Sequence, residues 1–283
     1  MNKKSAIIAV SVVIIILVIA CLTIVLLNNN NLKKDENDII KTDSEEENLK
    51  SENKIETKKP ENVVLNSKVG NEIQNCIYIP NIYSQYFFKQ LESSGLDDRA
   101  KIMFTFSKIV TENEYSSMLR QSENYPGDYI TNEDLQKVAN TIFLNANNLK
   151  HQEVYLSGSY DNENGNYIQL PTGFIEFSYV KDIVYKIEEV ENEFTVYTYR
   201  MYIDCNSSDA QDESLNSTQT IYYDTNKKNK AIIVNDESMD DESKETEYLN
   251  NLINSGKINK DKLNQGMYTL IKRGNNYLIK NIK

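Results

Sequence analysis

One apolar run near the N-terminus limits what this chain can be. Residues 6–27 read AIIAVSVVIIILVIACLTIVLL, with no charged residue, no proline and no glycine. As a helix that rises about 1.5 Å per residue, the run would be about 33 Å long. This length matches the roughly 30 Å hydrocarbon core of a bilayer. We therefore expect a single transmembrane helix over residues 6–27, with the lipid bilayer as its partner.

Three kinds of N-terminal segment contain such a run. A cleaved signal peptide has an apolar core of about 7–15 residues, which is shorter than this one. The Val-Ile-Ala that precedes Cys21 resembles a bacterial lipoprotein signal, but residues 22–27, LTIVLL, still suit a membrane. An uncleaved signal-anchor fits the whole run, so we expect residues 1–5 to form a cytoplasmic tail.

The charges around the run bear on its orientation. Lys3 and Lys4 lie beside the start of the run, whereas Lys33 and Lys34 lie further from its end, next to acidic residues. Basic residues favour the cytoplasmic side, and long downstream domains are translocated largely regardless of charge. We expect the N-terminus inside the cell and the rest of the chain outside the membrane.

Residues 28–61 are polar throughout: NNNNLKKDENDIIKTDSEEENLKSENKIETKKPE. The few apolar residues lack helical spacing, so this segment cannot bury enough surface to offset its chain entropy. The composition predicts a disordered polar linker, followed by a folded extracytoplasmic domain over residues 62–283. Lys58-Lys59 or the acidic residues 45–47 could serve as docking motifs, but such charge runs usually keep a tether solvated.

Apolar spacing in the first half of the domain predicts three helices. The first covers residues 83–91 and ends before Gly95, and the second covers residues 97–110. The third begins with the cap sequence Thr-Asn-Glu-Asp at residues 131–134 and continues to residue 143.

Residues rich in Tyr, Val and Ile predict strands, most of them after residue 145. The predicted strands or extended runs cover residues 63–65, 77–79, 151–156, 167–170, 174–180, 182–190, 193–204, 220–223, 231–234, 268–272 and 277–282. Turns are predicted at residues 191–192 and 273–275, and a short helix over residues 248–253 ends before Gly256. Helices followed by antiparallel strands define an α+β fold, with helices packed on one face of a curved sheet.

Several short sequences carry a family resemblance. The helix that ends in Ile142-Phe143, the following Lys150-His151 and the final hairpin YTLIKRGNNYLIKNI are similar to domains of uncharacterised single-pass or secreted proteins from low-GC Gram-positive bacteria. The order of helices and sheet also resembles the NTF2-like fold. This resemblance covers roughly residues 80–283 and implies a fold, but no activity.

Overall charge argues against two classes of partner. The chain carries a formal net charge of −11 and a pI near 4.8. Nucleic-acid binding requires clustered Lys and Arg, and so does docking on anionic lipid. We expect no nucleic-acid partner, and the glycine loops that bind phosphate groups are absent from the sequence.

The single histidine and the two cysteines outside the apolar run are weak candidates for catalysis. His151 lies at the start of a predicted strand, without a nucleophile motif, and is expected to be an ordinary surface or strand-end residue. Cys205 lacks a nearby activating base and is expected to be a structural thiol. An oxidising location would permit a Cys76–Cys205 disulfide, but two cysteines do not make a disulfide framework.

The acidic stretches have structural explanations as well. Residues 161–165, DNENG, look like part of a calcium loop, but the EF-hand glycine position would place Tyr160 at the first ligand. We predict a polar turn there, and a solvated loop or helix start over residues 236–247, DESMDDESKETE. Glu188 and Glu189 are neighbours on a strand and point to opposite faces. We therefore expect no catalytic, cofactor-binding or metal-binding residue, and no cofactor.

These observations favour a membrane-anchored protein whose extracytoplasmic domain binds or assembles with an envelope protein without catalysing a reaction. Two alternatives remain open. The domain could be a cell-envelope hydrolase that uses Asp and Glu residues from distant parts of the sequence, or a small-ligand-binding NTF2-like domain.

Overall fold

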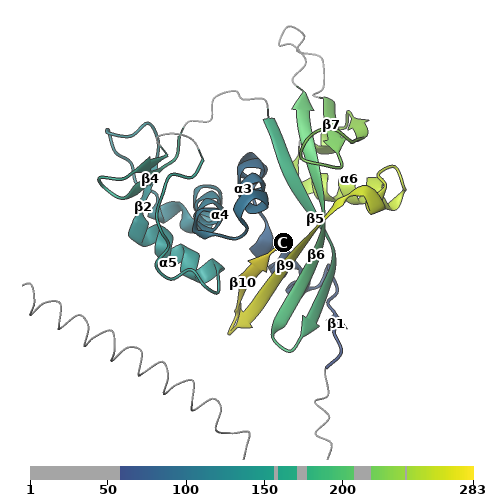
Figure 1. The fold of residues 1–283 in the computed structure, drawn as a ribbon, viewed down its shortest axis with the longest axis horizontal. Coiled ribbons are helices and arrows are strands. Elements are labelled where there is room, and N and C mark those ends of the chain that lie inside the picture. Colours follow the sequence, from purple (N-terminus) through teal and green to yellow (C-terminus); the bar gives the residue numbers. More distant parts are fainter. Residues whose placement is uncertain (1–57, 156–158, 171–176, 207–217, 240) are drawn as a thin grey trace, which may run out of the picture. The chain divides into compact units, whose positions relative to one another are not determined.

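The computed structural model describes residues 58–155, 159–170, 177–206, 218–239 and 241–283. The tail, the membrane helix and most of the linker expected over residues 1–57 lie outside this set. Among the residues described, no helix is long and apolar enough to cross a membrane. Helices followed mainly by antiparallel strands make up the described part of the chain, which confirms the α+β class (Figure 1).

The first helices of the described chain are α2 (Lys68–Ile77), α3 (Asn81–Ser94), α4 (Asp98–Thr111) and α5 (Asn132–Ile142). The last three confirm the predicted helices, and two of these begin at side-chain caps. Asp97 Oδ1 accepts a hydrogen bond from Ala100 N at 2.8 Å, and Thr131 Oγ1 accepts one from Asp134 N at 3.2 Å. Such caps satisfy N–H groups that the first turn leaves without partners. Helix α3 instead begins after Pro80, without a side-chain cap.

Helix α2 corrects the extended run predicted at residues 77–79, because Ile77 is the last residue of this helix. Ser67 caps the helix through a hydrogen bond that its Oγ accepts from Gly70 N at 3.0 Å. Glycine lowers the helix propensity of the segment, yet a Cβ at Gly70 would lie 2.4 Å from Leu65 O. Close packing against the preceding chain therefore outweighs local propensity.

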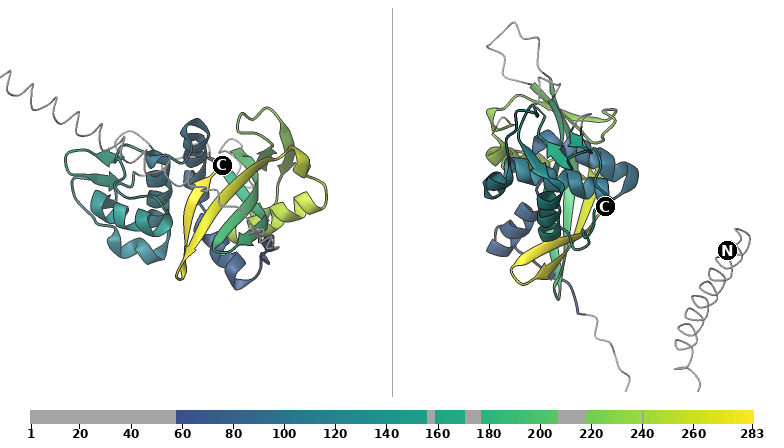
Figure 2. Two further views of the ribbon diagram at one scale, coloured as in Figure 1. Left: turned by 60° about the horizontal axis from the view of Figure 1, so that its bottom comes forward. Right: turned by 90° about the vertical axis from the view of Figure 1, so that its left-hand side faces the viewer.

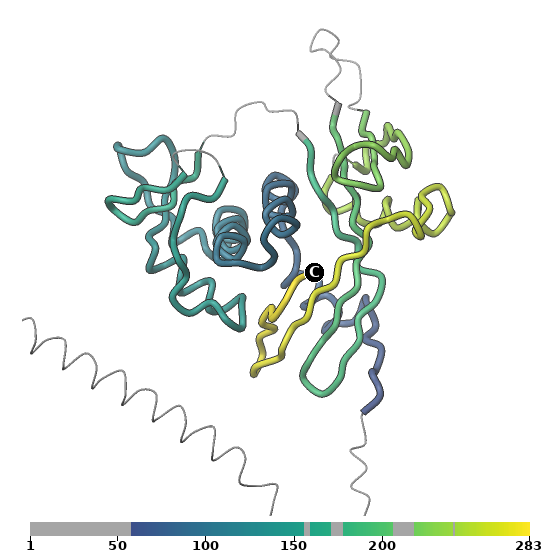
Figure 3. Tube along the Cα trace, viewed as in Figure 1, coloured from purple at the N-terminus to yellow at the C-terminus, as the bar shows by residue number. Residues whose placement is uncertain are grey.

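A seven-stranded antiparallel sheet is built on the long β5–β6 hairpin (Figure 3). Its strands are β1 (Glu61–Asn62), β5 (Phe177–Val190), β6 (Glu193–Asn206), β7 (Thr218–Tyr222), β8 (Lys230–Val234), β9 (Asn264–Arg273) and β10 (Asn276–Ile282). Strand β5 joins the predicted strands at residues 174–180 and 182–190, because its pairing with β6 continues through Lys181 and Asp182. Residues 174–176 of the first predicted strand lie outside the described residues. The predicted turn after β5 is confirmed at Glu191, whose φ is 61°.

Strand β6 changes its partner along its length. Residues 193–200 pair with β9 and residues 202–206 pair with β7, so the sheet divides near Met201. The predicted C-terminal hairpin is confirmed as β9–β10, with Gly274 in the turn at a φ of 61°.

A second, three-stranded sheet consists of β2 (Tyr129–Thr131), β4 (Asn166–Ile168) and β3 (Tyr160–Asp161). The strand predicted at residues 151–156 is wrong, because its first five residues lie in no strand. Side chains satisfy backbone groups there instead. Tyr167 OH accepts a hydrogen bond from Gln152 N at 3.2 Å, and Arg99 Nη2 donates one to Val154 O at 2.9 Å.

Both faces of the large sheet are covered, which differs from the expectation of helices on one face. Alternate residues of β5 point to opposite faces. Val180 packs in a core with Phe87 of α3 and Phe104 of α4. Ile183 packs in a second core with Leu249 of helix α6 (Glu242–Asn254). Helices α2–α5 therefore lie on one side of the sheet and α6 on the other (Figure 2).

Three short 3-10 helices complete the described elements: η1 (Asn113–Met118), η2 (Glu237–Met239) and η3 (Lys260–Lys262). Helix α6 is longer than the predicted helix over residues 248–253, since it already begins at Glu242. This earlier start brings acidic residues of the 236–247 segment against the sheet.

Candidate ligand-binding cleft

An open cleft of about 540 Å³ is lined by the start of α3 and the start of α6, among other elements. Its walls come from the α2–α3 connection, the first turn of α3, the C-terminal end of α4, strands β5, β6 and β7, and the start of α6. These elements span most of the domain's sequence, so the cleft exists only in the folded chain.

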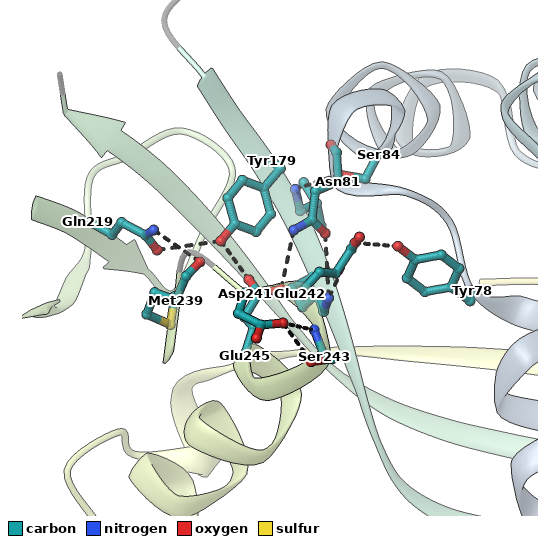
Figure 4. Close-up of polar contacts among 12 residues, drawn as sticks. Tyr78, Asn81, Ser84, Tyr179, Gln219, Met239, Asp241, Glu242, Ser243 and Glu245 are labelled. Atoms are coloured by element: carbon teal, nitrogen blue, oxygen red, sulfur yellow. Dashed lines mark hydrogen bonds and ion pairs between the residues drawn. The ribbon is translucent and has the colours of Figure 1, made fainter. Parts of the chain in front are cut away.

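A buried ion pair lies beside this cleft. Glu245 of α6 is fully buried, and the side chain of Lys181 on β5 is 7% exposed. Lys181 Nζ lies 2.7 Å from Glu245 Oε2. Tyr179 OH donates to Glu245 Oε1 at 2.5 Å, and Asn81 Nδ2 donates to Oε2 at 3.2 Å (Figure 4). The carboxylate thus has a cation and two neutral donors, which offset the cost of its burial.

A second carboxylate, Glu242, lies one turn earlier on α6 and forms part of the cleft wall. Its side chain is 47% exposed, and its Oε1 accepts a hydrogen bond from Tyr78 OH and lies 3.9 Å from Lys181 Nζ. Burial and the hydrogen bond to Glu242 raise the pKa of Tyr78 above its ordinary value. Burial and the charge of Glu245 likewise raise the pKa of Tyr179. Both hydroxyls therefore stay protonated and act as donors.

On the opposite side, Glu112 at the end of α4 contributes a third carboxylate. Lys108 Nζ donates to Glu112 Oε1 at 2.6 Å and to Asn75 O at 2.8 Å. The ring of Tyr78 lies near two ammonium groups, with its centroid 5.5 Å from Lys108 Nζ and 5.7 Å from Lys181 Nζ. These distances suit cation–π attraction.

Local sequence explains the placement of the α6 carboxylates. Asp241 caps the helix by accepting a hydrogen bond from Ser243 N at 3.0 Å. Glu242 and Glu245 then fall in the first turn, where negative charge is favoured by the helix dipole. Glu245 lies four residues before Leu249, on the buried face of the helix, so it points toward β5.

The structure places His151 away from this cleft. It is half-buried, with Nδ1 3.2 Å from Tyr167 OH, and burial lowers the pKa of His151. The cleft does include Cys205, whereas Cys76 donates through Sγ to Tyr277 O at 3.2 Å. Burial raises the pKa of the Cys76 thiol to about 11. No disulfide joins these two described cysteines.

The polar turn predicted at residues 161–165 is confirmed between β3 and β4. Asp161 Oδ1 accepts hydrogen bonds from Glu163 N at 2.9 Å and Asn164 N at 3.2 Å, and Gly165 has a φ of 66°. Over the described ranges, no group of three or more metal-ligating side chains is placed to hold an ion.

The expectation of a solvated loop or helix start over residues 236–247 holds for its exposed residues but not for Glu245. Two patterns could have revealed that these charged residues are buried. Glu245 shares the 3.6-residue spacing of Leu249 and Leu252, and Lys181 alternates with Tyr179 and Ile183 on β5. Each pattern places one charged residue on an apolar face, but neither identifies its partner.

Comparison of the chain with protein-family models, curated proteins and solved structures finds no match. The function must therefore be argued from the geometry of the cleft.

Proposed function

We propose that this chain is a single-pass membrane-anchored protein whose extracytoplasmic domain binds a small polar ligand in the cleft beside α6. The main support for this proposal is the buried Lys181–Glu245 ion pair, which lies next to a cleft that is open to solvent. Well-packed apolar residues often stabilise a fold as well as a buried ion pair does. Charged groups placed at such a cleft favour a role in recognition.

The membrane part of this proposal rests on the apolar run at residues 6–27. In the same proposal residues 1–5 are cytoplasmic, and a polar linker joins the run to the domain. As a flexible coil, that linker would extend about 30–35 Å. We also propose that the domain is related to NTF2-like domains and to uncharacterised envelope proteins of low-GC Gram-positive bacteria. The order of helices and sheet supports this relationship.

A carboxylate-based hydrolase is less well supported by the same residues. Glu245 is the most buried carboxylate at the cleft, and both of its oxygens already accept hydrogen bonds from Tyr179, Asn81 or Lys181. A general acid or base needs an oxygen that can reach the substrate. This arrangement argues against Glu245 as the catalytic carboxylate of a hydrolase.

Thermal unfolding of the full chain in detergent micelles tests the binding function. The chain is heated with and without each test compound, and the compounds are amines, amino sugars, neutral sugars, organic acids and short peptides. A ligand at 100 times its Kd stabilises the folded state by about 2.7 kcal/mol, which raises Tm by several degrees.

Two variants of α3 show whether the binding occurs in the cleft. Ile82→Trp fills the mouth of the cleft, whereas Glu92→Trp adds the same ring at an exposed position further along the helix. A Tm increase should occur in the parent and in E92W and be absent in I82W. A response to no compound, or an equal response in I82W, would overturn the function. A response only to a purified envelope protein would favour the assembly alternative.

A further inference from the structure

Several polar side chains of the cleft donate hydrogen bonds to other groups of the protein. Asn81 Nδ2 donates to Glu245, and Gln219 Nε2 donates to Met239 O at 3.3 Å. The hydroxyls of both cleft tyrosines donate to glutamates of α6. At the end of α4, Thr111 Oγ1 donates to a carbonyl of its own helix at 2.7 Å. Each of these side chains therefore already has a donor engaged within the protein.

Acceptors, by contrast, remain available on two carboxylates. A carboxylate has two oxygens and about four lone-pair positions. For Glu242 and Glu112, every hydrogen bond and ion pair made with the described residues falls on Oε1. Both residues line the cleft, and their Oε2 atoms make no hydrogen bond or ion pair with the described residues.

The net charge of the groups around the cleft also favours a cationic ligand. Three carboxylates (Glu112, Glu242 and Glu245) face two ammonium groups (Lys108 and Lys181), which leaves one negative charge in excess. Each ammonium already lies close to a carboxylate and above an aromatic ring. The surroundings thus favour one further cation.

We infer that the ligand of this cleft carries a protonated amine, whose N–H groups donate to Glu242 and Glu112. This inference rests on the proposed binding function and specifies its ligand class. The amine fits because it supplies several donors and one positive charge. Pro80, Ile82 and Met239 of the cleft lining provide apolar contacts for a carbon chain or ring.

An anionic ligand is the main competitor. Helix α3 begins at the cleft without a side-chain cap, and an uncapped helix N-terminus attracts anions. The carboxylates of Glu112 and Glu242 border the same space and repel an anion. The two carboxylates outweigh the partial charge of one helix end, which is about half an elementary charge.

Three probes of equal chain length separate these possibilities. Saturation-transfer NMR on the full chain in detergent micelles detects weak binding of 1,5-diaminopentane, 1,5-pentanediol and glutarate. Spermidine serves as a longer amine. We expect saturation transfer to the two amines, and little to the diol or to glutarate.

Matched variants locate the binding. Glu242→Gln keeps the shape of the side chain and an acceptor for Tyr78 but removes the charge. It should raise the Kd of the amines at least tenfold, and Glu112→Gln should raise it about threefold or more. Glu247→Gln removes an exposed carboxylate from the same helix, outside the cleft lining, and should leave the Kd unchanged. Circular dichroism shows whether each variant is folded.

Each other outcome contradicts the inference in a distinguishable way. If the diol binds as well as the diamine, or if glutarate binds instead, the ligand class is wrong while the binding function stands. If amine binding persists in E242Q and E112Q, or falls equally in E247Q, the amine is attracted only by the acidic surface. If neither these probes nor the compounds of the thermal screen bind, both proposals fail.

Discussion

Glu245 and Lys181 form a buried ion pair between α6 and strand β5. Each is almost fully buried, so each depends on its partner to offset lost hydration. Glu242, at 3.9 Å from Lys181 Nζ, is too far and too exposed to replace Glu245. The ion pair therefore helps to hold α6 against the sheet.

Replacement of Glu245 by Gln should lower the free energy of unfolding by about 3–5 kcal/mol, because it leaves a buried ammonium group without its counter-charge. Urea unfolding followed by circular dichroism measures the change. The double variant Lys181→Met/Glu245→Leu should lose less than the sum of its single variants, by roughly 0.5–3 kcal/mol. Strictly additive losses would contradict a direct interaction.

Asp161 provides a pH-dependent test in the β3–β4 turn. Hydrogen bonds from the side chains of Asn164 and Tyr125 lower the pKa of Asp161 from its ordinary 3.8 to about 2. A lowered folded-state pKa means that the carboxylate stabilises the fold above about pH 4, and that this contribution is lost as the pH falls toward 2.

The parent chain and Asp161→Asn should therefore differ in Tm by a constant amount between pH 5 and 7, and the difference should shrink between about pH 4 and 2. Comparing the Tm of the variant with that of the parent at each pH cancels the effect of other carboxyl groups that titrate in the same range. A difference that does not change with pH would show that the charge of Asp161 contributes nothing.

At the scale of elements, caps and apolar spacing predicted helices well. Thr131 and Asp97 mark helix starts that the structure confirms. Helix α2 escaped prediction because Gly70 lowers local propensity, while the contact that requires the glycine is visible only after folding. The single strand β5 also could not be inferred, since Lys181 and Asp182 resemble a break unless their buried partners are known.

Thr131 tests the cap of α5 directly. Thr131→Ala removes the acceptor for Asp134 N and should lower the free energy of unfolding by about 1 kcal/mol. Thr131→Ser keeps the hydroxyl and should lose much less. Equal losses in the two variants, measured by urea unfolding, would assign the effect to the methyl group rather than to the cap.

At the scale of the whole molecule, the sequence predicted the α+β class but not the candidate site. The cleft joins residues as distant as Tyr78 and Glu242, and pairing of this kind leaves no local signal. Glu245 was detectable in principle from its position on an apolar helical face. Its partner on β5 could be assigned only once α6 was placed against that strand.

Membrane topology is a prediction for the whole chain. With residues 6–27 as a signal-anchor, protease added to intact cells should degrade or release the C-terminal domain, as detected by an antibody to a C-terminal tag. A cytoplasmic protein in the same cells serves as the control for lysis. A tag that is protected until the cells are broken would contradict the expected orientation.

The central claim is that the cleft beside α6 binds an amine. Hydrogen–deuterium exchange of the full chain, with and without spermidine, locates the binding most directly. We predict slower exchange confined to residues 78–82, 111–112 and 241–246, at the start of α3, the end of α4 and the start of α6. Unchanged exchange, or slower exchange only elsewhere, such as at the separate hollow beside Lys227, would contradict the claim.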